Sequence, residues 1–313
     1  MKTRFSISAF AFASLVALAA CSPETAPAAE TETPAAPVIA AFTAGPDVHT
    51  FTIGEFQAAA VRDGGGQFPN DNTTLAVNKT KADVDALLTA NGLPTDQLSL
   101  SIQPLIVRTA DKVMLFDTGA ASTMGDFGGK LPASLQAAGV DPASVTDIFI
   151  SHDHGDHVGG LVTAEGALAF PNATVHMSAP QWTVMQGNAQ LAPIVTAITP
   201  KVDAFEPGAD VAPSVKAIDI PGHTPGHSGY MITSGDASLV FIGDTAHHSV
   251  ISVQRPDWTI AFDSDAPTAE ASRKMYLEQW AGSGQRLFAP HFPFPGVGKV
   301  EKQGDTIVWI PEP

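Results

Sequence analysis

The chain has 313 residues, 32 acidic against 16 basic side chains and a formal net charge of −16. This length allows one large α/β domain or two small ones, and an apolar fraction of 44% is enough for a sizeable core. Nucleic acid and anionic membrane surfaces are poor partners for so acidic a chain, which argues against a nuclease. Because the chain has a single cysteine, it can form no internal disulfide and no metal site built on several thiolates.

The first 21 residues have the pattern of an export signal. Lys2 and Arg4 precede an uncharged, apolar run that ends at Ala20, and this run is short for a helix that spans a bilayer. The sequence Leu-Ala-Ala-Cys ending at Cys21 resembles a bacterial lipobox, in which the cysteine becomes the lipidated N-terminus. We therefore predict an exported protein, held by a lipid on Cys21 at the periplasmic face of a membrane, with the outer membrane favoured. The alternative is cleavage near Ala20, which leaves a periplasmic protein with a free thiol.

Residues 22–46 are predicted to be a disordered tether. Up to residue 37 the segment consists almost entirely of Ser, Pro, Glu, Thr and Ala, which cannot bury enough apolar surface to become ordered. The folded catalytic domain is expected over residues 47–313.

The domain mixes strands and helices. Thr80 and Asp83 form a plausible capping box for a helix that ends before Asn91-Gly92, and Gly64-Gly65-Gly66 is interpreted as flexible. Strands are expected over residues 50–54, 56–62, 98–109, 112–117, 145–150, 174–177, 215–220, 229–233 and 239–242, and helices over 80–90, 131–138, 179–198 and 268–280, with a further helix starting at Gly159. Strands in groups of two or three between single helices favour two mixed sheets covered by helices over a doubly wound parallel sheet.

One stretch, residues 151–157, concentrates metal-ligand side chains. The β-branched run before it predicts a strand, and in extended geometry His152 and His154 share a face and can converge on one point. Gly155 permits a turn, after which Asp156 and His157 can aim at a second point. Neutral imidazole and carboxylate are ligands of zinc and similar ions, so the stretch predicts a metal site.

Three later apolar strands also end in a possible ligand. They lead to His223, Asp244 and His291. A single His or Asp after a strand is more often a turn residue or a cap. Four such strand ends in one chain could supply seven ligands, enough for two metals, if they meet at one edge of the sheets.

The motif His-x-His-x-Asp-His at residues 152–157, followed by His223, Asp244 and His291, resembles the metallo-β-lactamase-fold hydrolases. The resemblance implies the αββα fold, two mixed β-sheets flanked by helices, from about residue 47 on. It also implies two divalent ions, with zinc preferred over Mn, Fe or Co. The implied ligands are His152, His154 and His223 at one ion, Asp156, His157 and His291 at the other, and Asp244 between them. Asp117, in Leu-Phe-Asp-Thr-Gly, would support the ligand loop from behind.

Shorter motifs resemble the branch that contains methyl parathion hydrolase and related lactonases. They include Gly243-Asp244-x-x-His247, residues 262–265 and residues 291–296. By this resemblance Phe127 and Trp182 would contact the substrate, although ordinary packing explains them equally well. His247 would support the metal ligands, and His227 is expected to be structural.

The implied activity is hydrolysis of a lactone, an aryl ester or a phosphotriester by a hydroxide shared between the two metals. Asp244 is expected to take or relay the proton, with Asp156 as the other catalytic carboxylate. A small-molecule substrate is the expected partner, and a homodimer is compatible with the sequence. The alternatives are a β-lactamase, a thioesterase-type metallo-hydrolase and a metal-binding lipoprotein without enzymatic activity. Retention of all seven ligands favours an enzyme.

Overall fold

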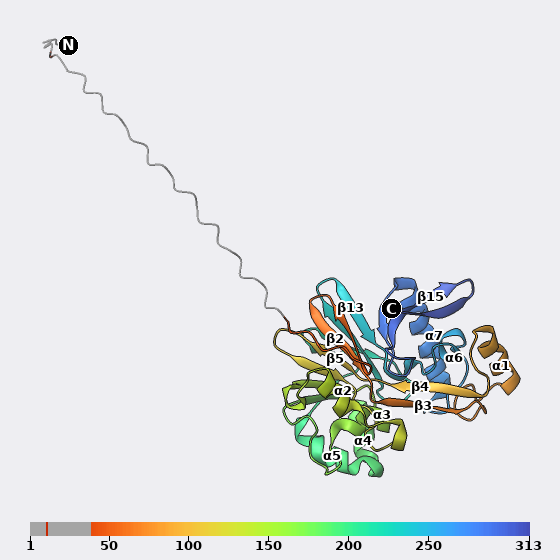
Figure 1. The fold of residues 1–313 in the computed structure, drawn as a ribbon, viewed down its shortest axis with the longest axis horizontal. Coiled ribbons are helices and arrows are strands. Elements are labelled where there is room, and N and C mark those ends of the chain that lie inside the picture. Colours follow the sequence, from red (N-terminus) through yellow and green to blue (C-terminus); the bar gives the residue numbers. More distant parts are fainter. Residues whose placement is uncertain (1–10, 12–38) are drawn as a thin grey trace, which may run out of the picture. The chain divides into compact units, whose positions relative to one another are not determined.

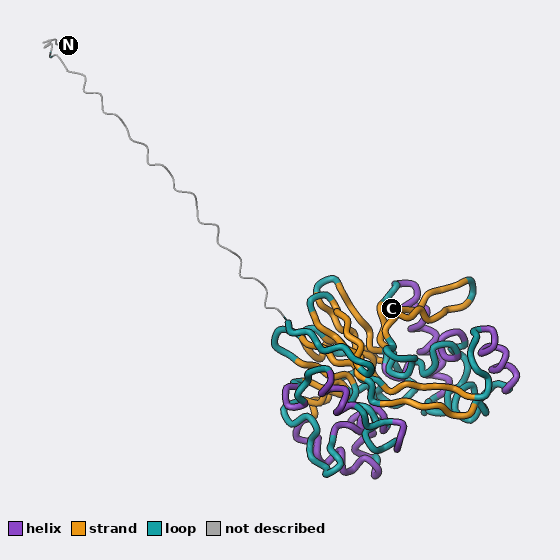
Figure 2. The backbone as a smooth tube through the Cα atoms, in the orientation of Figure 1, coloured by secondary structure: helices purple, strands orange, loops and turns teal. Residues whose placement is uncertain are grey.

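The computed structural model describes residue 11 and residues 39–313, and two seven-stranded sheets form the centre of the folded part (Figures 1 and 2). The first sheet consists of β1 (Val48–Ile53), β2 (Phe56–Val61), β5 (Leu105–Arg108), β6 (Val113–Phe116), β7 (Asp147–Phe149), β8 (Thr174–Ser178) and β9 (Val202–Phe205), in that order. The second consists of β10 (Asp210–Ala212), β11 (Val215–Asp219), β12 (Ser228–Ser234), β13 (Ala237–Phe241), β14 (Arg286–Phe288), β15 (Val297–Gln303) and β16 (Thr306–Pro311). Both sheets are mixed, because β6 to β9 pair in parallel, as do β13 and β14, while the other pairs are antiparallel.

Helices cover the outer face of each sheet. The helices are α1 (Lys81–Ala90), α2 (Leu131–Ala137), α3 (Gly155–Val158), α4 (Ala179–Gly187), α5 (Ala192–Ile198), α6 (Ile251–Gln254) and α7 (Ala266–Ser283). One core cluster joins the first sheet to α2, α4 and α5, and another joins the second sheet to α7. The resulting four layers, helix, sheet, sheet and helix, are the predicted αββα architecture. None of the helices in the described part of the chain is long and apolar enough to cross a bilayer.

Aromatic side chains fill the space between the two sheets. Phe116 and Phe149 of the first sheet stack at 4.9 Å between ring centroids, and Tyr230 of the second sheet packs against both. Burial of each such side chain stabilises the fold by roughly 1.5–3 kcal/mol. The Tyr230 hydroxyl also donates to the carbonyl of Ile150 at 2.5 Å, and Ser228 N donates to the carbonyl of Ser151 at 3.0 Å. These two bonds fix the start of the ligand stretch to the second sheet.

Several predicted elements have the expected ends. Thr80 and Asp83 form the capping box of α1, and Asn91 follows its last residue. The hairpin of β5 and β6 is also present. Its first strand, however, is shorter than predicted, because residues 98–109 divide into β4 (Gln97–Ile102) and β5 at Gln103-Pro104. Proline has no N–H for a sheet ladder, so the chain leaves one sheet there and enters another.

Three further expectations differ from the structure. Gly64-Gly65-Gly66 is not a flexible loop but lies in β3 (Gly64–Pro69), which pairs with β4 to form a two-stranded ribbon. No α-helix begins at Gly159, since one turn of α3 and a 3₁₀ turn at Gly159–Leu161 complete this segment. Ordered contacts begin before Asp47: Phe42 is buried in the core, and Arg108 donates to the carbonyl of Ala40. Apart from residue 11, the predicted signal segment with Cys21 lies outside the described residues, as does most of the predicted tether.

Candidate metal centre

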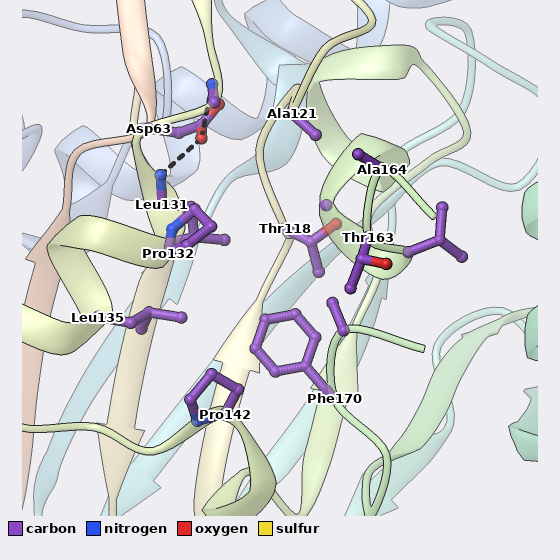
Figure 3. A pocket seen from close by; sticks show the side chains of 14 residues that line it. Asp63, Thr118, Ala121, Leu131, Pro132, Leu135, Pro142, Thr163, Ala164 and Phe170 are labelled. Atoms are coloured by element: carbon purple, nitrogen blue, oxygen red, sulfur yellow. Dashed lines mark hydrogen bonds between the residues drawn. The ribbon is translucent and has the colours of Figure 1, made fainter. Parts of the chain in front are cut away.

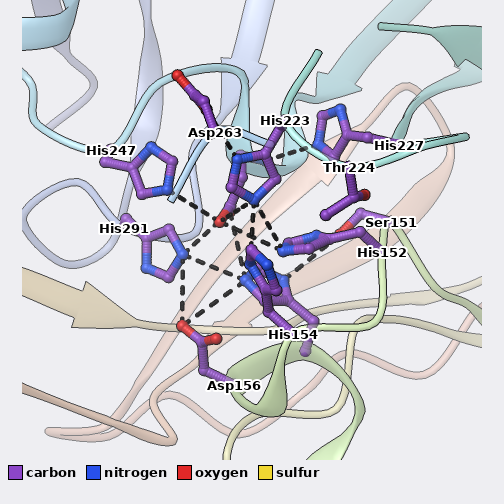
Figure 4. Close-up of polar contacts among 12 residues, drawn as sticks. Ser151, His152, His154, Asp156, His223, Thr224, His227, His247, Asp263 and His291 are labelled. Atoms are coloured by element: carbon purple, nitrogen blue, oxygen red, sulfur yellow. Dashed lines mark hydrogen bonds and ion pairs between the residues drawn. The ribbon is translucent and has the colours of Figure 1, made fainter. Parts of the chain in front are cut away.

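The predicted ligands come together at one edge of the two sheets (Figure 4). Strands β11 and β13 both pair antiparallel with β12 and therefore run in the same direction, and β14 runs parallel to β13. Their carboxyl ends, with those of β6 and β7, carry the loops that hold the ligands. His152 lies beyond the end of β7 rather than in extended strand, and His154 is the residue before α3. Convergence of these two residues thus depends on the loop and not on strand geometry.

The first group of possible metal ligands contains His152, His154, His223 and Asp244. His223 Nε2 lies 3.1 Å from both His152 Nε2 and His154 Nδ1. A tetrahedral ion with metal–nitrogen bonds near 2.05 Å requires ligand atoms about 3.3 Å apart. Both distances are close to this value, as expected for ligands around one ion.

The second group contains Asp156, His157 and His291. His291 Nε2 lies 3.3 Å from His157 Nε2, and an oxygen of Asp156 lies 3.6–3.7 Å from these nitrogens. Asp156 and His157 are the second and third residues of α3, which begins at Gly155 directly after His154.

Asp244 lies between the two groups. Its Oδ2 is 3.3 Å from His223 Nε2 and 3.5 Å from His152 Nε2, whereas its Oδ1 is 3.0 Å from His291 Nε2 and 3.3 Å from His157 Nε2. Asp244 is buried, and within the described residues Oδ1 has no hydrogen-bond partner. A buried carboxylate oxygen without a partner is costly, and a metal ion would satisfy it. The donor set thus fits two ions joined by one carboxylate.

The electrostatics agree with this arrangement. Burial favours the neutral form of His152 and His154, lowering the pKa of His152 well below its ordinary value and that of His154 to about 4. Burial also opposes charge on His157, but the carboxylates of Asp244 and Asp156 outweigh it and raise the pKa of His157 well above its ordinary value. Burial alone would raise the pKa of Asp244, yet the surrounding histidines, His157 first, lower it well below the ordinary range. The pocket therefore favours cations next to Asp244.

Asp117 supports the second ligand group through a hydrogen bond to His157. It accepts hydrogen bonds from the Ser151 backbone at 2.8 Å, the Ser151 hydroxyl at 2.7 Å and His157 Nδ1 at 2.7 Å. The contact to His157 leaves Nε2 free to bind metal. Asp117 has a φ of 58°, a left-handed conformation that is uncommon for a residue other than glycine. Such strain is often found at functional sites.

His247 and His227 both contact Asp244 but differ in how they do so. His247 Nε2 lies 3.1 Å from Asp244 Oδ2, and its ring stacks on that of His291. His227 donates from Nδ1 to the carbonyl of Ile220 at 3.0 Å and accepts the Asp244 backbone N–H on Nε2 at 2.9 Å. His227 is therefore structural, as expected, and fixes the backbone of Asp244.

Neither of the predicted substrate residues belongs to a ligand group. Phe127 is 40% exposed on the loop of residues 119–130, and its ring lies against Gly66 of β3. A Cβ on Gly66 would collide with that ring. Trp182 is partly buried in α4 and packs against the core of the first sheet.

Asp63 anchors the loop that carries Phe127. Its buried carboxylate accepts backbone N–H groups from Ala120 at 2.8 Å, Gly129 at 3.1 Å and Leu131 at 2.9 Å. Asp63 also borders an apolar cavity of about 290 Å³ between α2 and residues 162–170 (Figure 3). None of the seven predicted metal ligands lines this cavity.

Asp63, Asp263 and Arg273 have roles in the structure that were not predicted from the sequence. Asp263 accepts from His223 Nδ1 at 2.9 Å and also binds Arg273 of α7 at 2.6 Å. Asp263 lies in the motif of residues 262–265, but nothing in the sequence pairs it with His223, 40 residues away. A buried arginine on a helix has no local sequence pattern that distinguishes it from an exposed one.

Comparisons with known proteins agree with the geometry. Residues 102–291 match the Metallo-beta-lactamase superfamily. The structure resembles that of "AidC, a Dizinc Quorum-Quenching Lactonase", with a TM-score of 0.80 and 30% identity over 85% of this chain and 97% of that chain. It also resembles "hydrolase AbOPH in beta lactamase superfamily", with a TM-score of 0.78 and 28% identity over 87% of this chain and 99% of that one.

Among curated sequences, an N-acyl homoserine lactonase of Bacillus sp is 24% identical over 201 residues, which are 58% of this chain and 77% of that protein. The match to the superfamily covers more than half of the chain, and its residues form the expected ligand groups. This chain therefore belongs to the metallo-beta-lactamase superfamily, in its lactonase-like branch, and is a metal-dependent hydrolase.

Proposed function

We propose that this protein is a dizinc lactonase, with N-acyl lactones as the favoured substrate class. The observation that carries the proposal is the position of Asp244, with one carboxylate oxygen facing each ligand group. A carboxylate in this position keeps two ions close enough to act on one substrate group. Zinc is supported by the imidazole and carboxylate donors and by the similarity to a dizinc enzyme.

When bound, two divalent ions would lower the pKa of a shared water to about 7 and neutralise charge on a substrate oxygen. The protein supplies the rest. Asp244 is placed to accept the proton of the attacking water, and His247 Nε2, at 3.1 Å from its Oδ2, is placed to receive that proton or hold it. His227 keeps the Asp244 backbone in position during this exchange, since its Nε2 accepts the Asp244 N–H.

The substrate class is supported by the relatives. The similarity to AidC extends over nearly all of that chain at 30% identity, and the Bacillus protein also bears the name of a lactonase. A β-lactamase of the common type would hold its second metal with a cysteine. The only cysteine of this chain is Cys21, far in sequence from the ligand loops. Aryl esters and phosphotriesters have electrophilic centres that the same groups could attack, so they belong in the test.

The test is a panel of rates for the zinc-loaded protein. Its substrates are N-hexanoyl homoserine lactone, an aryl acetate, a phosphotriester and a β-lactam. We expect the highest kcat/KM for the lactone and a loss of at least about 10²-fold in His154→Ala, because removal of a ligand impairs the metal site. Fastest turnover of the β-lactam would refute the substrate class, and equal rates in wild type and His154→Ala would refute catalysis at this centre.

We also propose that the enzyme is exported and lipidated at Cys21. The support is the basic and apolar N-terminal segment followed by Leu-Ala-Ala-Cys. Growth with a radiolabelled fatty acid should label the membrane-bound wild-type protein but not Cys21→Ser. Labelling of Cys21→Ser, or an unlabelled wild type, would contradict lipidation.

A further inference from the structure

We propose that Asp263 and Arg273 are positioning residues that link α7 to His223, so that only one of the two metal sites depends on this helix. The proposal rests on the two-metal centre of the proposed function but not on the identity of the substrate. It separates the site of His152, His154 and His223, hereafter the three-histidine site, from the site of Asp156, His157 and His291, hereafter the aspartate site.

The link is a continuous chain of short contacts between buried groups. His223 Nδ1 lies 2.9 Å from Asp263 Oδ1, and Asp263 Oδ2 lies 2.6 Å from Arg273 Nη2. The side chains of His223, Asp263 and Arg273 are 3%, 0% and 1% exposed. Since solvent does not reach these groups, water cannot easily replace any one of them.

The contact to Asp263 sets the tautomer of His223. An ionised carboxylate can only accept, so His223 must carry its proton on Nδ1. The lone pair of Nε2 then points towards His152 Nε2 and His154 Nδ1, each 3.1 Å away. Asp263 thus prepares His223 to bind a metal ion.

Arg273 explains how Asp263 can be buried in this position. A buried carboxylate without a cation or full hydrogen bonding is strongly destabilising, and Arg273 supplies the cation. Arg273 is itself held by the carbonyls of Thr245 at 2.9 Å, Pro256 at 2.9 Å and Trp258 at 3.4 Å. Thr245 follows Asp244 in the chain, but the Asp244 backbone N–H is held separately by His227 Nε2 at 2.9 Å, so the shared ligand should keep its position without Arg273.

The aspartate site is supported by different groups. His157 Nδ1 contacts Asp117, and His291 Nδ1 lies 2.8 Å from the carbonyl of Ser101. Among the described residues, no lysine or arginine forms an ion pair with Asp117. Asp117 and Ser101 come from the loop after β6 and from β4, and neither belongs to α7.

Loss of the contacts between Arg273, Asp263 and His223 should therefore weaken metal binding at the three-histidine site only. Changes to groups behind a ligand typically cost 10–100-fold in metal affinity. In Asp263→Asn, the single amide oxygen can accept from Arg273 or from His223 but not serve both as the carboxylate does. When it faces Arg273, the amide NH₂ faces His223 Nδ1 and favours the tautomer with a proton on Nε2, which cannot bind metal.

The experiment is a zinc titration of the metal-free protein against a competing chelating dye, which resolves two binding steps. His223→Ala and His291→Ala identify which step belongs to which site. In Arg273→Met and Asp263→Asn, we expect the step of the three-histidine site to weaken about 10–100-fold and the other step to change less than about 3-fold. Asp117→Asn is the matched control, and it should weaken mainly the step of the aspartate site, because Asp117 contacts His157 directly and reaches His152 only through the Ser151 hydroxyl.

A second measurement separates positioning from general loss of structure. In the His223→Ala background, Arg273→Met should cause no further loss of zinc affinity, because its effect passes through His223. In the His291→Ala background its full effect on the three-histidine site should remain. If Arg273→Met does not fold, Arg273→Lys and Asp263→Asn provide the same comparison, with a smaller loss expected for the lysine because it keeps the charge.

Equal weakening of both steps, or no weakening of either, would refute the proposal. So would a further loss on adding Arg273→Met to His223→Ala. Failure to hydrolyse any substrate of the rate panel would refute the proposed function, yet it would leave these two zinc-binding steps measurable and the inference intact.

Discussion

The metal centre and the loop of residues 119–130 lie close together but are built in opposite ways. Each ligand at the centre follows a strand of one of the two sheets, and all except His154 and Asp156 are buried. The loop instead places Met124 and Phe127 in solvent, 43% and 40% exposed, and its ends are held by Asp63. We therefore expect the chemistry to be fixed by the fold, and we predict that exposed side chains of the loop affect substrate preference without disturbing the metal ligands.

The largest expected effect on activity comes from replacing Asp244, the carboxylate between the two ligand groups. In Asp244→Asn, one carboxylate oxygen becomes an amide NH₂, which cannot bind a metal and faces one ligand group. We expect kcat to fall by about 10³-fold or more, in line with loss of a group that stabilises transition-state charge. Metal analysis should show fewer than two ions per chain. The fold should survive, because His227 bonds the backbone of this residue.

Asp153 provides the matched control for this variant. It is a buried aspartate in the same stretch as His152 and His154 but belongs to neither ligand group. Asp153→Asn should keep two ions and a kcat within about 10-fold of wild type. If Asp244→Asn kept both ions and a comparable rate, Asp244 would not be the shared ligand.

A smaller effect is expected from changing the loop alone. The ring of Phe127 lies where a Cβ on Gly66 would be, so Gly66→Ala should displace the ring while leaving the ligands in place. If the ring contributes about 1–1.5 kcal/mol to binding of the acyl chain, its displacement would raise KM for a long-chain lactone about 5–10-fold. The kcat and the zinc content should stay unchanged. Steady-state kinetics with short and long acyl chains measures this.

Two variants test the assignment to Phe127. Phe127→Ala should raise KM similarly, and the double variant with Gly66→Ala should be no worse than Phe127→Ala. Gly187→Ala is a neutral control, because an added Cβ there meets no atom within 4 Å. Unchanged KM in both Gly66→Ala and Phe127→Ala would place the substrate wall elsewhere.

The same contrast explains what could be predicted from sequence. The metal ligands could be predicted because each follows an apolar strand. Strands that run in one direction bring their carboxyl ends to one edge of a sheet. The order of strands and helices favoured two mixed sheets covered by helices, and the resemblance to the metallo-β-lactamase-fold hydrolases implied the αββα arrangement. Both patterns are local, or depend only on chain direction.

The missed features depend on contacts between distant segments. Asp63 is a buried carboxylate with backbone partners near residues 120–131, and its sequence neighbours, three glycines, suggested flexibility. In the structure these glycines lie in β3 and pair with β4. A side chain at Gly64 or Gly66 would collide with Phe127, and one at Gly65 would collide with the β4 backbone. Arg273 looks like an ordinary helix residue until Asp263 and three carbonyls surround it.

The smallest expected effect is a dependence of protein stability on pH that arises at His248. His248 follows His247, and its Nδ1 accepts the N–H groups of Val250 and Ile251, both at 3.2 Å, at the start of α6. Burial lowers the pKa of His248 from 6.5 to about 4. Between these values the unfolded chain binds more protons than the folded one, so stability falls as the pH drops from about 6.5 towards 4. The loss attributable to His248 is at most on the order of 3 kcal/mol.

His248→Asn should remove this part of the acid sensitivity, because an asparagine oxygen can accept the same N–H groups and does not titrate. The measurement is urea unfolding of the metal-free variant and wild type at several pH values from 7 to 4. The other histidines titrate in both proteins, so the difference between the two curves isolates His248. Parallel curves would mean that His248 contributes nothing to acid sensitivity. A flatter curve for the variant would show that protonation of His248 itself weakens the segment that follows His247.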